Sequence, residues 1–420
     1  MAKNNLINIH CFNTEIGKLG FDEDRNVSFF QYNPSFLSSG LYSNMFPLII
    51  RRMTQTQVFD KYNSETFKGL PPMIADSLPD VFGNIVFKAW LESTHKGLEK
   101  ITVLEQLAYV GKRGMGALEY LPSKEVTGDA TINIDEITGI VEEVLRTKGE
   151  AKEAQLNHAA LLNIFKIGTS AGGVRPKILI SENKLTGQII PGDLVYSGEY
   201  DHYIIKLGIT EGLSYSKEAV EYAYYLMASA AGINMMPTKM IDNKHFATLR
   251  FDRQNGEKIH TLTASGMSGL DFKDPAASSY ENLFDLSVYL KLPHKDTEQL
   301  FRRMVFNLVF ANHDDHLKNH SFVYDKEHDG WGLSPAYDVT FSLNPEINFS
   351  KTSRALSLNG KRVGIALEDI LIIADKYTIK NAKGIIKEVQ DVIPLSNDKA
   401  QEVGIPDKII ASIRKDFMTF

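Results

Sequence analysis

Apolar and polar residues alternate near the start of the chain, in short runs separated by turn-forming residues. The alternation has a period of two over residues 6–58, most clearly in residues 7–12 and 27–32. Gly17 and Gly20 lie between these two runs. Because the side chains of a strand point alternately to its two faces, this pattern predicts a small β-sheet unit.

The apolar period changes to three and four residues further along the chain. It predicts a helical segment from about Pro71 through Ala89 and two more helical stretches within residues 135–165. A mixed region follows. Its expected elements are strands at residues 177–180, 203–207 and 246–251, and a helix near residues 217–231 that ends at Gly232.

From about Tyr280 the pattern is mostly helical, with an apolar face over residues 300–311 and further helices expected at 370–377 and 382–393. A mixed lobe followed by a helical lobe is the order found in protein kinases. We therefore expect an α+β chain with a two-lobed, protein-kinase-like fold. Its expected parts are an N-terminal subdomain with a β-rich start (1–122), the rest of a mixed N-terminal lobe (123–255) and a mainly helical C-terminal lobe (256–420).

Composition narrows the class of protein. A chain of 420 residues exceeds what one hydrophobic core usually serves, so two or three packed subdomains are expected. The net charge of −6 argues against non-specific nucleic-acid binding by the whole surface. The single cysteine, Cys11, excludes an internal disulfide and a cysteine-based structural zinc site. With no signal-like start and no apolar run near the ~20 residues of a membrane span, we expect a cytoplasmic protein without a membrane segment.

The most informative motif is the run from Asn312 to Asn319, followed by Tyr337-Asp338. In protein kinases an Asp of the catalytic loop accepts the proton of the substrate hydroxyl, an Asn five residues later binds one magnesium ion, and a later Asp binds the other. Asp314, Asn319 and Asp338 have that order. The run departs from the usual kinase sequence at His316, where a protein kinase has Lys, and after Asp338, which Val-Thr follows instead of Phe-Gly.

A glycine-rich turn precedes the first strand of the mixed region. Small residues let backbone N–H groups approach phosphate oxygens, and Lys177 adds a positive charge where the strand begins. Taken alone, Gly172-Gly173 indicates a plain turn, but its polar and cationic neighbours favour a phosphate-binding loop. We assign nucleotide binding to Ser170, Ala171, Gly172, Gly173 and Lys177. A second glycine-rich loop, residues 111–116, is interpreted as structural.

Lys206 ends a predicted strand, and Glu221 lies fifteen residues later in a predicted helix. The pair resembles the strand Lys and helix Glu of kinases, in which the carboxylate holds the lysine toward the nucleotide phosphates. Glu218 competes for this role, although the helix dipole accounts for an acidic residue in the first turn.

These motifs together resemble one family, the HipA-type serine/threonine kinases, which are the toxins of bacterial type II toxin–antitoxin pairs. The resemblance covers nearly the whole chain. It is carried by residues 76–80, 110–118, 170–177, 202–206, 232–234 with Glu221, 250–253, 314–319 and 335–338.

The resemblance implies roles for individual residues. Ser170 is expected to be an autophosphorylation site whose modification inactivates the protein, since a phosphate there competes with those of the nucleotide. Phe251 and Asp252 match the hinge that holds adenosine. The family's other assignments fall on Lys206 and Glu221 for phosphate binding, Asp314 as the base, and Asn319 and Asp338 as magnesium ligands, with ATP and Mg²⁺ as cofactors.

The resemblance also implies partners. The expected substrate is a protein of the translation apparatus, such as an aminoacyl-tRNA synthetase, and the expected antitoxin is a HipB-like DNA-binding protein. Contact with DNA should be mainly indirect, because the chain is acidic.

Two other classes of function are compatible with parts of the sequence. The histidines at 313, 316 and 320, together with Asp314, could belong to an HD-like metal-dependent phosphohydrolase. The chain could also be a non-catalytic co-repressor acting with a DNA-binding antitoxin, but the joint presence of Asp314, Asn319 and Asp338 argues against a degenerate kinase.

Overall fold

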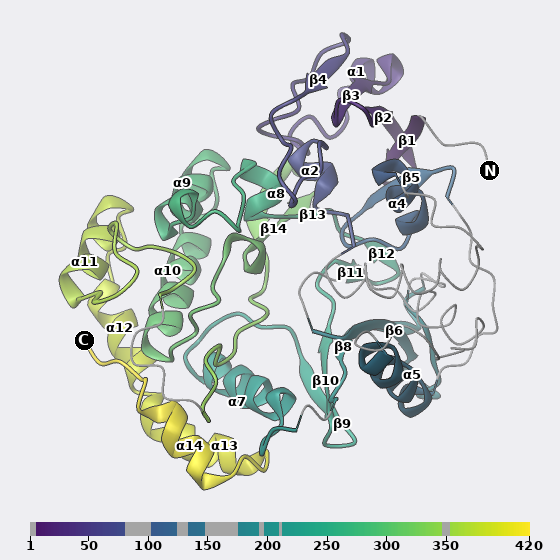
Figure 1. Cartoon of the computed structure of the whole chain (residues 1–420). Coiled ribbons are helices and arrows are strands. Elements are labelled where there is room, and N and C mark those ends of the chain that lie inside the picture. The colour runs from purple at the N-terminus through teal and green to yellow at the C-terminus, as the bar shows by residue number, and fades with distance from the viewer. Residues whose placement is uncertain are drawn as a thin grey trace. The chain divides into compact units, whose positions relative to one another are not determined.

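A computed structural model gives the fold of most of the chain (Figure 1). The residues it describes are 6–79, 102–123, 133–147, 175–192, 197–209, 212–346 and 353–420. They form two compact units: unit 1 comprises Met1–Ile209 and Ala247–Thr261, and unit 2 comprises Thr210–Phe246 and Leu262–Phe420. The division falls within strand β10, His245–Leu249, which therefore belongs to both.

Unit 1 begins with the expected β-sheet. Five strands form it in the order β4-β3-β2-β1-β5. They are β1 (Leu6–Cys11), β2 (Thr14–Asp22), β3 (Val27–Tyr32), β4 (Gln57–Phe59) and β5 (Leu118–Leu121). In β1 the alternate residues Ile7, Ile9 and Cys11 are fully buried, so the period-two pattern does mark one core-facing side of the sheet. The prediction of a β-rich start is confirmed.

The helices in the described part of unit 1 are α1 (Pro34–Ser39), α2 (Pro72–Ala75), α4 (Val103–Val110) and α5 (Ile134–Thr147). Thr102 and Glu105 form a capping box that begins α4, and Gly111 follows its last residue with φ +54°. The loop that begins at Gly111 then leads into β5, which agrees with the interpretation of residues 111–116 as a structural loop. Residues 80–89 and 148–165 of the predicted helical segments lie outside the described residues.

A second sheet in unit 1 contains all three strands predicted for the mixed region. Its order within the unit is β7-β6-β8-β10, with β6 (Lys177–Asn183), β7 (Ile189–Pro191) and β8 (Tyr200–Lys206). The hairpin of β11 (Arg253–Gln254) and β12 (Glu257–Lys258) follows β10. The core of the sheet is aliphatic, because Ile178, Leu179, Ile180 and Ile205 are fully buried.

Unit 2 is mainly helical. It begins with α7 (Lys217–Ala230), which Ser216 caps and after which Gly232 adopts φ +76°, and it continues into β9 (Thr238–Ile241). A three-stranded sheet, β13-β14-β15, is formed by Thr261–Thr263, Ser321–Asp325 and Gly330–Leu333. The helices are α8 (Ala264–Ser268), α9 (Tyr280–Tyr289), α10 (His294–Val309), α11 (Leu367–Lys376), α12 (Ala382–Gln390), α13 (Ser396–Glu402) and α14 (Asp407–Arg414). Helix α10 supplies the centre of the core, with Leu300, Phe301 and Met304 fully buried.

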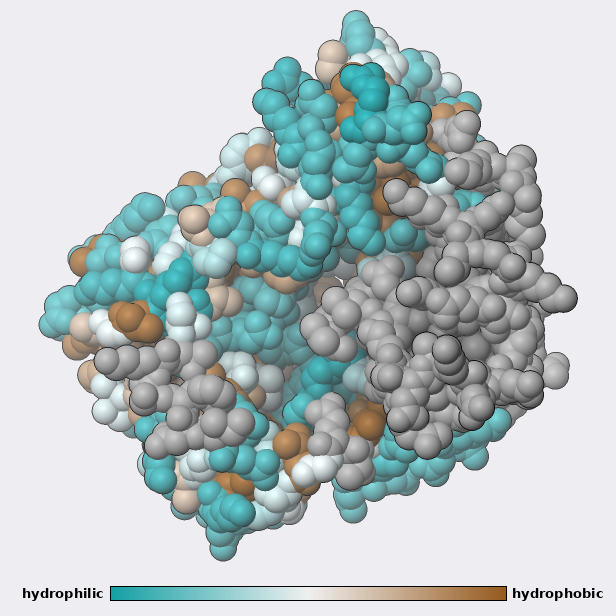
Figure 2. Space-filling view, in the orientation of Figure 1, coloured by the Kyte–Doolittle hydropathy of each residue, from teal (hydrophilic) through white to brown (hydrophobic). Residues whose placement is uncertain are grey.

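Figure 2 shows hydrophobic residues in small scattered groups within a largely hydrophilic face. Within the described residues, no helix is both long enough and apolar enough to span a bilayer.

Two buried histidines, His260 and His320, should make the free energy of unfolding depend on pH. Burial lowers the pKa of His260 and of His320 from 6.5 to about 3. Because the folded pKa lies below the unfolded one, the unfolded chain takes up protons first as the pH falls below about 6.5. Each histidine should therefore reduce the free energy of unfolding by about 1.4 kcal/mol per pH unit between about 6.5 and about 3. Denaturation of His260→Gln at several pH values should show a smaller slope than that of wild type. An unchanged slope in His260→Gln would contradict this assignment.

Candidate active site

The loop after α10 is held by hydrogen bonds at its first residues and is exposed at Asp314, its predicted catalytic residue. Buried Asn312 donates from its backbone N–H to the carbonyl of Asn307 over 3.1 Å, and its side-chain amide donates to Asn307 Oδ1 over 3.1 Å. The backbone N–H of His313 donates to Ser342 Oγ over 2.7 Å. The side chain of Asp314, which comes next, is 69% exposed. A carboxylate presented to solvent on a fixed loop can reach a hydroxyl of another protein.

Asn319 closes the five-residue loop that the sequence predicted. Its side-chain amide donates to the carbonyl of Asp314 over 2.7 Å, and its backbone N–H donates to the carbonyl of His316 over 2.8 Å. Fully buried Leu317 anchors the short 3₁₀ turn Leu317–Asn319. With its N–H₂ group used inside the loop, Asn319 has its amide oxygen for a hard cation.

Tyr337 connects the segment that carries Asp338 to this loop. Its hydroxyl donates to the carbonyl of Lys318 over 2.7 Å and lies 2.5 Å from Ser321 Oγ. Asp338 follows in the left-handed region with φ +57°, a conformation that is uncommon for a residue other than glycine and that is often found at functional sites.

One cavity of unit 2 brings the two predicted magnesium ligands together. It is lined by Ile233, Arg303, Asn307, Asn312, Asp315, Asn319, His320, Ala336, Tyr337, Asp338 and Val339. Asn319 and Asp338 come from segments about twenty residues apart, and the hydrogen bonds of Tyr337 hold those segments side by side. The cavity thus has a carboxylate and an amide oxygen, which are ligands that suit Mg²⁺.

Asp315, on the buried side of the loop, is a residue whose role the sequence did not indicate. The hydroxyl of Tyr280 donates to Asp315 Oδ2, and the backbone N–H of Leu356 donates to Oδ1 over 3.3 Å. Arg354 Nε lies 3.9 Å from Oδ2, and Arg354 also donates to the carbonyls of Asn307 and Asn312. Burial raises the pKa of Asp315, while the guanidinium of Arg354 and the hydroxyl of Tyr280 oppose that rise. Two acidic neighbours, Asp314 and Asp315, therefore have opposite environments.

The histidines of the loop are engaged in packing. The ring of His316 lies 4.8 Å from that of Phe272, and the ring of His320 meets that of Tyr280 edge-on at 6.2 Å. Burial is the main cause that lowers the pKa of His320, and the positive charge of Arg303 adds to it. Within the ranges that the structure describes, no group of three or more His, Cys, Asp or Glu side chains could hold a metal ion.

The two predicted phosphate-binding lysines of unit 1 face each other across β6 and β8. Lys177 and Lys206 are directly opposite in the antiparallel register, and they are 3% and 7% exposed. Directly opposite residues of an antiparallel pair lie on the same face of the sheet, so both lysines belong to one face, and their binding of phosphate stays a prediction. Ser170, Ala171, Gly172 and Gly173 of the glycine-rich turn lie outside the described residues.

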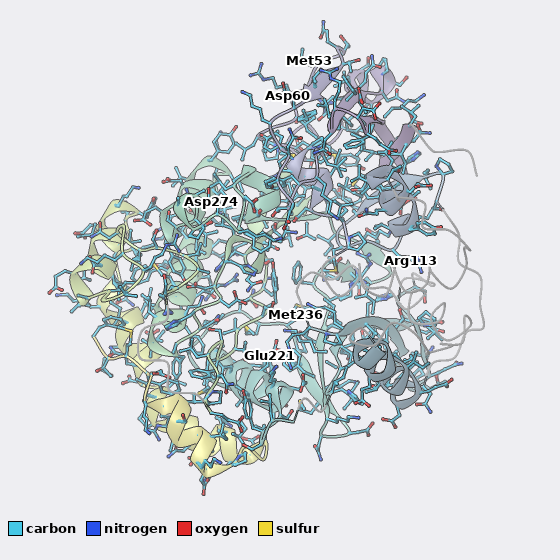
Figure 3. The ribbon with its side chains drawn as sticks, viewed as in Figure 1. Met53, Asp60, Arg113, Glu221, Met236 and Asp274 are labelled. Carbon is cyan, nitrogen blue, oxygen red and sulfur yellow. The ribbon has the colours of Figure 1, made fainter. Side chains whose placement is uncertain are left out.

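Glu221 lies on α7 of unit 2 and is 2% exposed (Figure 3). Glu218, one turn earlier, is buried as well and accepts a hydrogen bond from Ser216 Oγ over 3.3 Å, as suits a residue of the first turn. Lys206 and Glu221 belong to different units, so their pairing stays a prediction.

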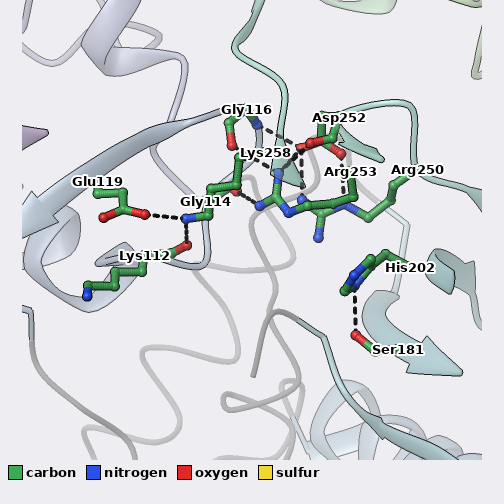
Figure 4. A network of polar contacts seen from close by, with 10 residues as sticks. All are labelled: Lys112, Gly114, Gly116, Glu119, Ser181, His202, Arg250, Asp252, Arg253 and Lys258. Carbon is green, nitrogen blue, oxygen red and sulfur yellow. Dashed lines mark hydrogen bonds and ion pairs between the residues drawn. The ribbon is translucent and has the colours of Figure 1, made fainter. Parts of the chain in front are cut away.

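The predicted adenosine hinge contains a buried ion-pair network (Figure 4). Arg250 donates to Asp252 Oδ1 from Nε over 2.9 Å and to Oδ2 from Nη2 over 2.8 Å, while Arg253 Nη1 donates to Oδ2 over 2.8 Å. The carbonyl of Asp252 accepts the N–H of Ile259 over 2.9 Å. Asp252 is fully buried, so its carboxylate is used inside the protein, and its contact with adenosine stays a prediction. Phe251, between the two charged residues, is half-buried.

Comparisons with known proteins show to which family the chain belongs. The family model of the HipA-like C-terminal domain matches residues 169–395, more than half of the chain, and that of the HipA N-terminal domain matches residues 7–121. The chain belongs to the HipA family. These matches confirm the resemblance inferred from the motifs. The matched residues of the chain include the loop of Asp314 and the strands of the first sheet.

The individual relatives differ in the share of this chain to which they are similar. A Haemophilus influenzae protein named as a candidate kinase is 31% identical over 131 residues, which are 29% of this chain and 38% of the relative, so the chain spans well under half of that relative. The HipA toxin of Shewanella oneidensis, solved with HipB and its operator DNA, is similar with a TM-score of 0.65 at 16% identity, over 98% of this chain and 95% of that one. This likeness confirms the α+β fold class. The proinflammatory kinase CtkA of Helicobacter pylori has a TM-score of 0.35 at 10% identity, over 51% of this chain and 85% of that one, which does not establish a shared fold.

Proposed function

We propose that this HipA-family chain is an ATP- and Mg²⁺-dependent serine/threonine protein kinase and the toxin of a toxin–antitoxin pair. The observation that carries the proposal is the joint placement of Asn319 and Asp338 in one cavity, with Asp314 exposed at the start of the same loop. Membership of the family supports it. The domain boundaries proposed from the sequence, 1–122, 123–255 and 256–420, assign the nucleotide loop and hinge to the second part and this cavity to the third.

Each residue has a distinct task in this mechanism. Asp338 and Asn319 would hold Mg²⁺, which neutralises charge on the phosphates when it is bound. Asp314 orients the substrate hydroxyl and accepts its proton. Lys177 and Lys206 bind phosphate oxygens, with Glu221 as the proposed carboxylate partner of Lys206.

The substrate we propose is a protein of the translation apparatus, such as an aminoacyl-tRNA synthetase, and the antitoxin partner is a HipB-like DNA-binding protein. The relative from Shewanella oneidensis supports the second part, since it was solved with HipB and operator DNA. The net charge of −6 favours DNA contact through the antitoxin.

The reaction class can be tested by incubating the purified chain with labelled ATP and a generic protein acceptor. Phosphoryl transfer should require magnesium, should tolerate manganese and should not be supported by zinc. His316→Gln and His320→Gln should reduce the rate only modestly, because these rings pack against Phe272 and Tyr280 and have no proposed role as metal ligands. Stoichiometric zinc or iron that is lost together with activity in these variants would instead favour a phosphohydrolase.

Regulation by Ser170 forms a separate part of the proposal. A phosphate on this residue would place close to two negative charges where the nucleotide phosphates bind, so Ser170→Asp should weaken ATP binding by about tenfold or more, and Ser170→Ala should keep most of it. Label from ATP should be found on Ser170 by mass spectrometry. Equal ATP affinity of the Ser170→Asp and Ser170→Ala variants would show that Ser170 is not the switch.

A further inference from the structure

The loop at residues 111–116 of the N-terminal subdomain is bonded to the hinge segment at 250–253, and both belong to unit 1 (Figure 4). The backbone N–H of Gly116 donates to Asp252 Oδ2 over 2.8 Å. In return, Arg253 donates from Nη1 to the carbonyl of Gly116 over 3.0 Å and from Nη2 to that of Gly114 over 2.8 Å. We call these contacts of Gly114 and Gly116 with Asp252 and Arg253 the N-terminal latch.

The latch is charged and withdrawn from water. The side chains of Arg250 and Asp252 are 0% exposed, and that of Arg253 is 1% exposed. A buried carboxylate shared by two guanidinium groups is stable only while its hydrogen bonds are complete, since a charge left without them in a low dielectric is costly. Movement of the loop away from the hinge would therefore disturb the whole network.

A second attachment holds the hairpin that follows the hinge. Lys258 on β12 donates to the carbonyl of Lys112 and, over 2.7 Å, to Glu119 Oε1 on β5. Only 11% of the Lys258 side chain and 14% of the Glu119 side chain are exposed. The segment from Arg250 to Lys258 is thus bonded to the N-terminal subdomain at both ends.

The same segment is bonded to the sheet that carries the phosphate-binding lysines. The backbone N–H of Arg250 donates to the carbonyl of His202 on β8 over 2.8 Å, and the His202 ring lies 2.8 Å from Ser181 Oγ on β6. Four residues after His202, β8 ends at Lys206. The hinge therefore lies between β8 and the loop of the N-terminal subdomain, and its position depends on both.

We propose that the N-terminal latch sets the position of the adenosine hinge, and so that the N-terminal subdomain controls nucleotide affinity. This inference rests on the proposed function, which supplies the nucleotide. Asp252 is a positioning residue: its carboxylate acts through Arg253 and Gly116 and does not contact the nucleotide.

Two variants disturb the latch by different means. At Gly116, φ is +73° and an added Cβ would lie 3.0 Å from the backbone N and 3.1 Å from the carbonyl oxygen of Thr261, so Gly116→Ala should push the loop from Asp252. Arg253→Lys keeps the charge but cannot reach two carbonyls at once. The matched control is Lys184→Ala, which breaks an exposed ion pair with Asp201 in the same unit.

The experiment measures dissociation constants for ATP-Mg²⁺ and for magnesium tripolyphosphate, which engages the phosphate site without the hinge. Both latch variants should bind ATP about tenfold more weakly, an ordinary size for coupling between sites. Their affinity for tripolyphosphate should equal that of wild type, and the control should match wild type for both ligands.

Hydrogen exchange of the wild type supplies an independent measurement. Because coupling is reciprocal, ATP-Mg²⁺ should slow exchange in peptides covering residues 111–118, and Arg253→Lys should lose this effect. Unchanged ATP affinity in both variants, or equal losses for ATP and tripolyphosphate, would overturn the latch alone. A wild type that binds no ATP would overturn the proposed function and this inference with it.

Discussion

Asp314→Asn and Asp338→Asn should each reduce phosphoryl transfer by about 10²–10⁴-fold, but only Asp338→Asn should weaken nucleotide binding. Asp314 is exposed at the start of its loop and has no place in the lining of the cavity, so its loss should remove the base and leave ATP-Mg²⁺ binding intact. Asp338 lines the cavity with Asn319, so its loss should weaken the binding of the magnesium-bound nucleotide.

Calorimetric titration of ATP-Mg²⁺ into both variants separates these two roles. Asp325→Asn is a suitable control, because the Asp325 carboxylate lies in the same unit and is 52% exposed. Its hydrogen bonds within the described residues are local ones, to Glu327 and His328. It should match wild type in rate and affinity. Wild-type affinity in Asp338→Asn would show that the metal assignment is wrong.

Asp315→Ala should have the largest effect on stability, a loss of about 3–5 kcal/mol in the free energy of unfolding. The substitution leaves the guanidinium of Arg354, the hydroxyl of Tyr280 and the N–H of Leu356 without their carboxylate in a buried site. Breaking a buried pair by removing one partner is costly because the remaining charge has lost its compensation. The loop of Asp314 should lose its fixed position as a consequence.

Two milder variants grade this effect. Asp315→Asn keeps an oxygen that can accept a hydrogen bond from Tyr280 but loses the negative charge. Tyr280→Phe keeps the aromatic ring and removes one hydroxyl, which should lower the free energy of unfolding by about 1–3 kcal/mol. Urea denaturation should rank Asp315→Ala as least stable of the three, with Asp325→Ala within about 0.5 kcal/mol of wild type. If Asp315→Ala is as stable as this control, the network does not hold the loop.

The sequence by itself determined the elements and the spacing of the catalytic residues, because both depend on neighbours along the chain. The strands expected at residues 177–180, 203–207 and 246–251 correspond to β6, β8 and β10, and the helix expected to end at Gly232 is α7. The five-residue interval from Asp314 to Asn319 forms a loop that one side-chain amide closes locally, while the catalytic roles of the two residues stay predictions.

The tertiary structure decided which charged residues are exposed to solvent and which are buried in ion-pair networks. Asp314 and Asp315 are adjacent and chemically identical, yet one is exposed and the other buried, because Tyr280 and Arg354 come from distant parts of the chain. Asp252 matched a nucleotide hinge by motif, but Gly116, more than a hundred residues earlier, bonds to its carboxylate. The pairing of Lys177 with Lys206 likewise depends on strand register. Burial and ion pairing arise from contacts between segments far apart in sequence, and a local pattern carries no information about them.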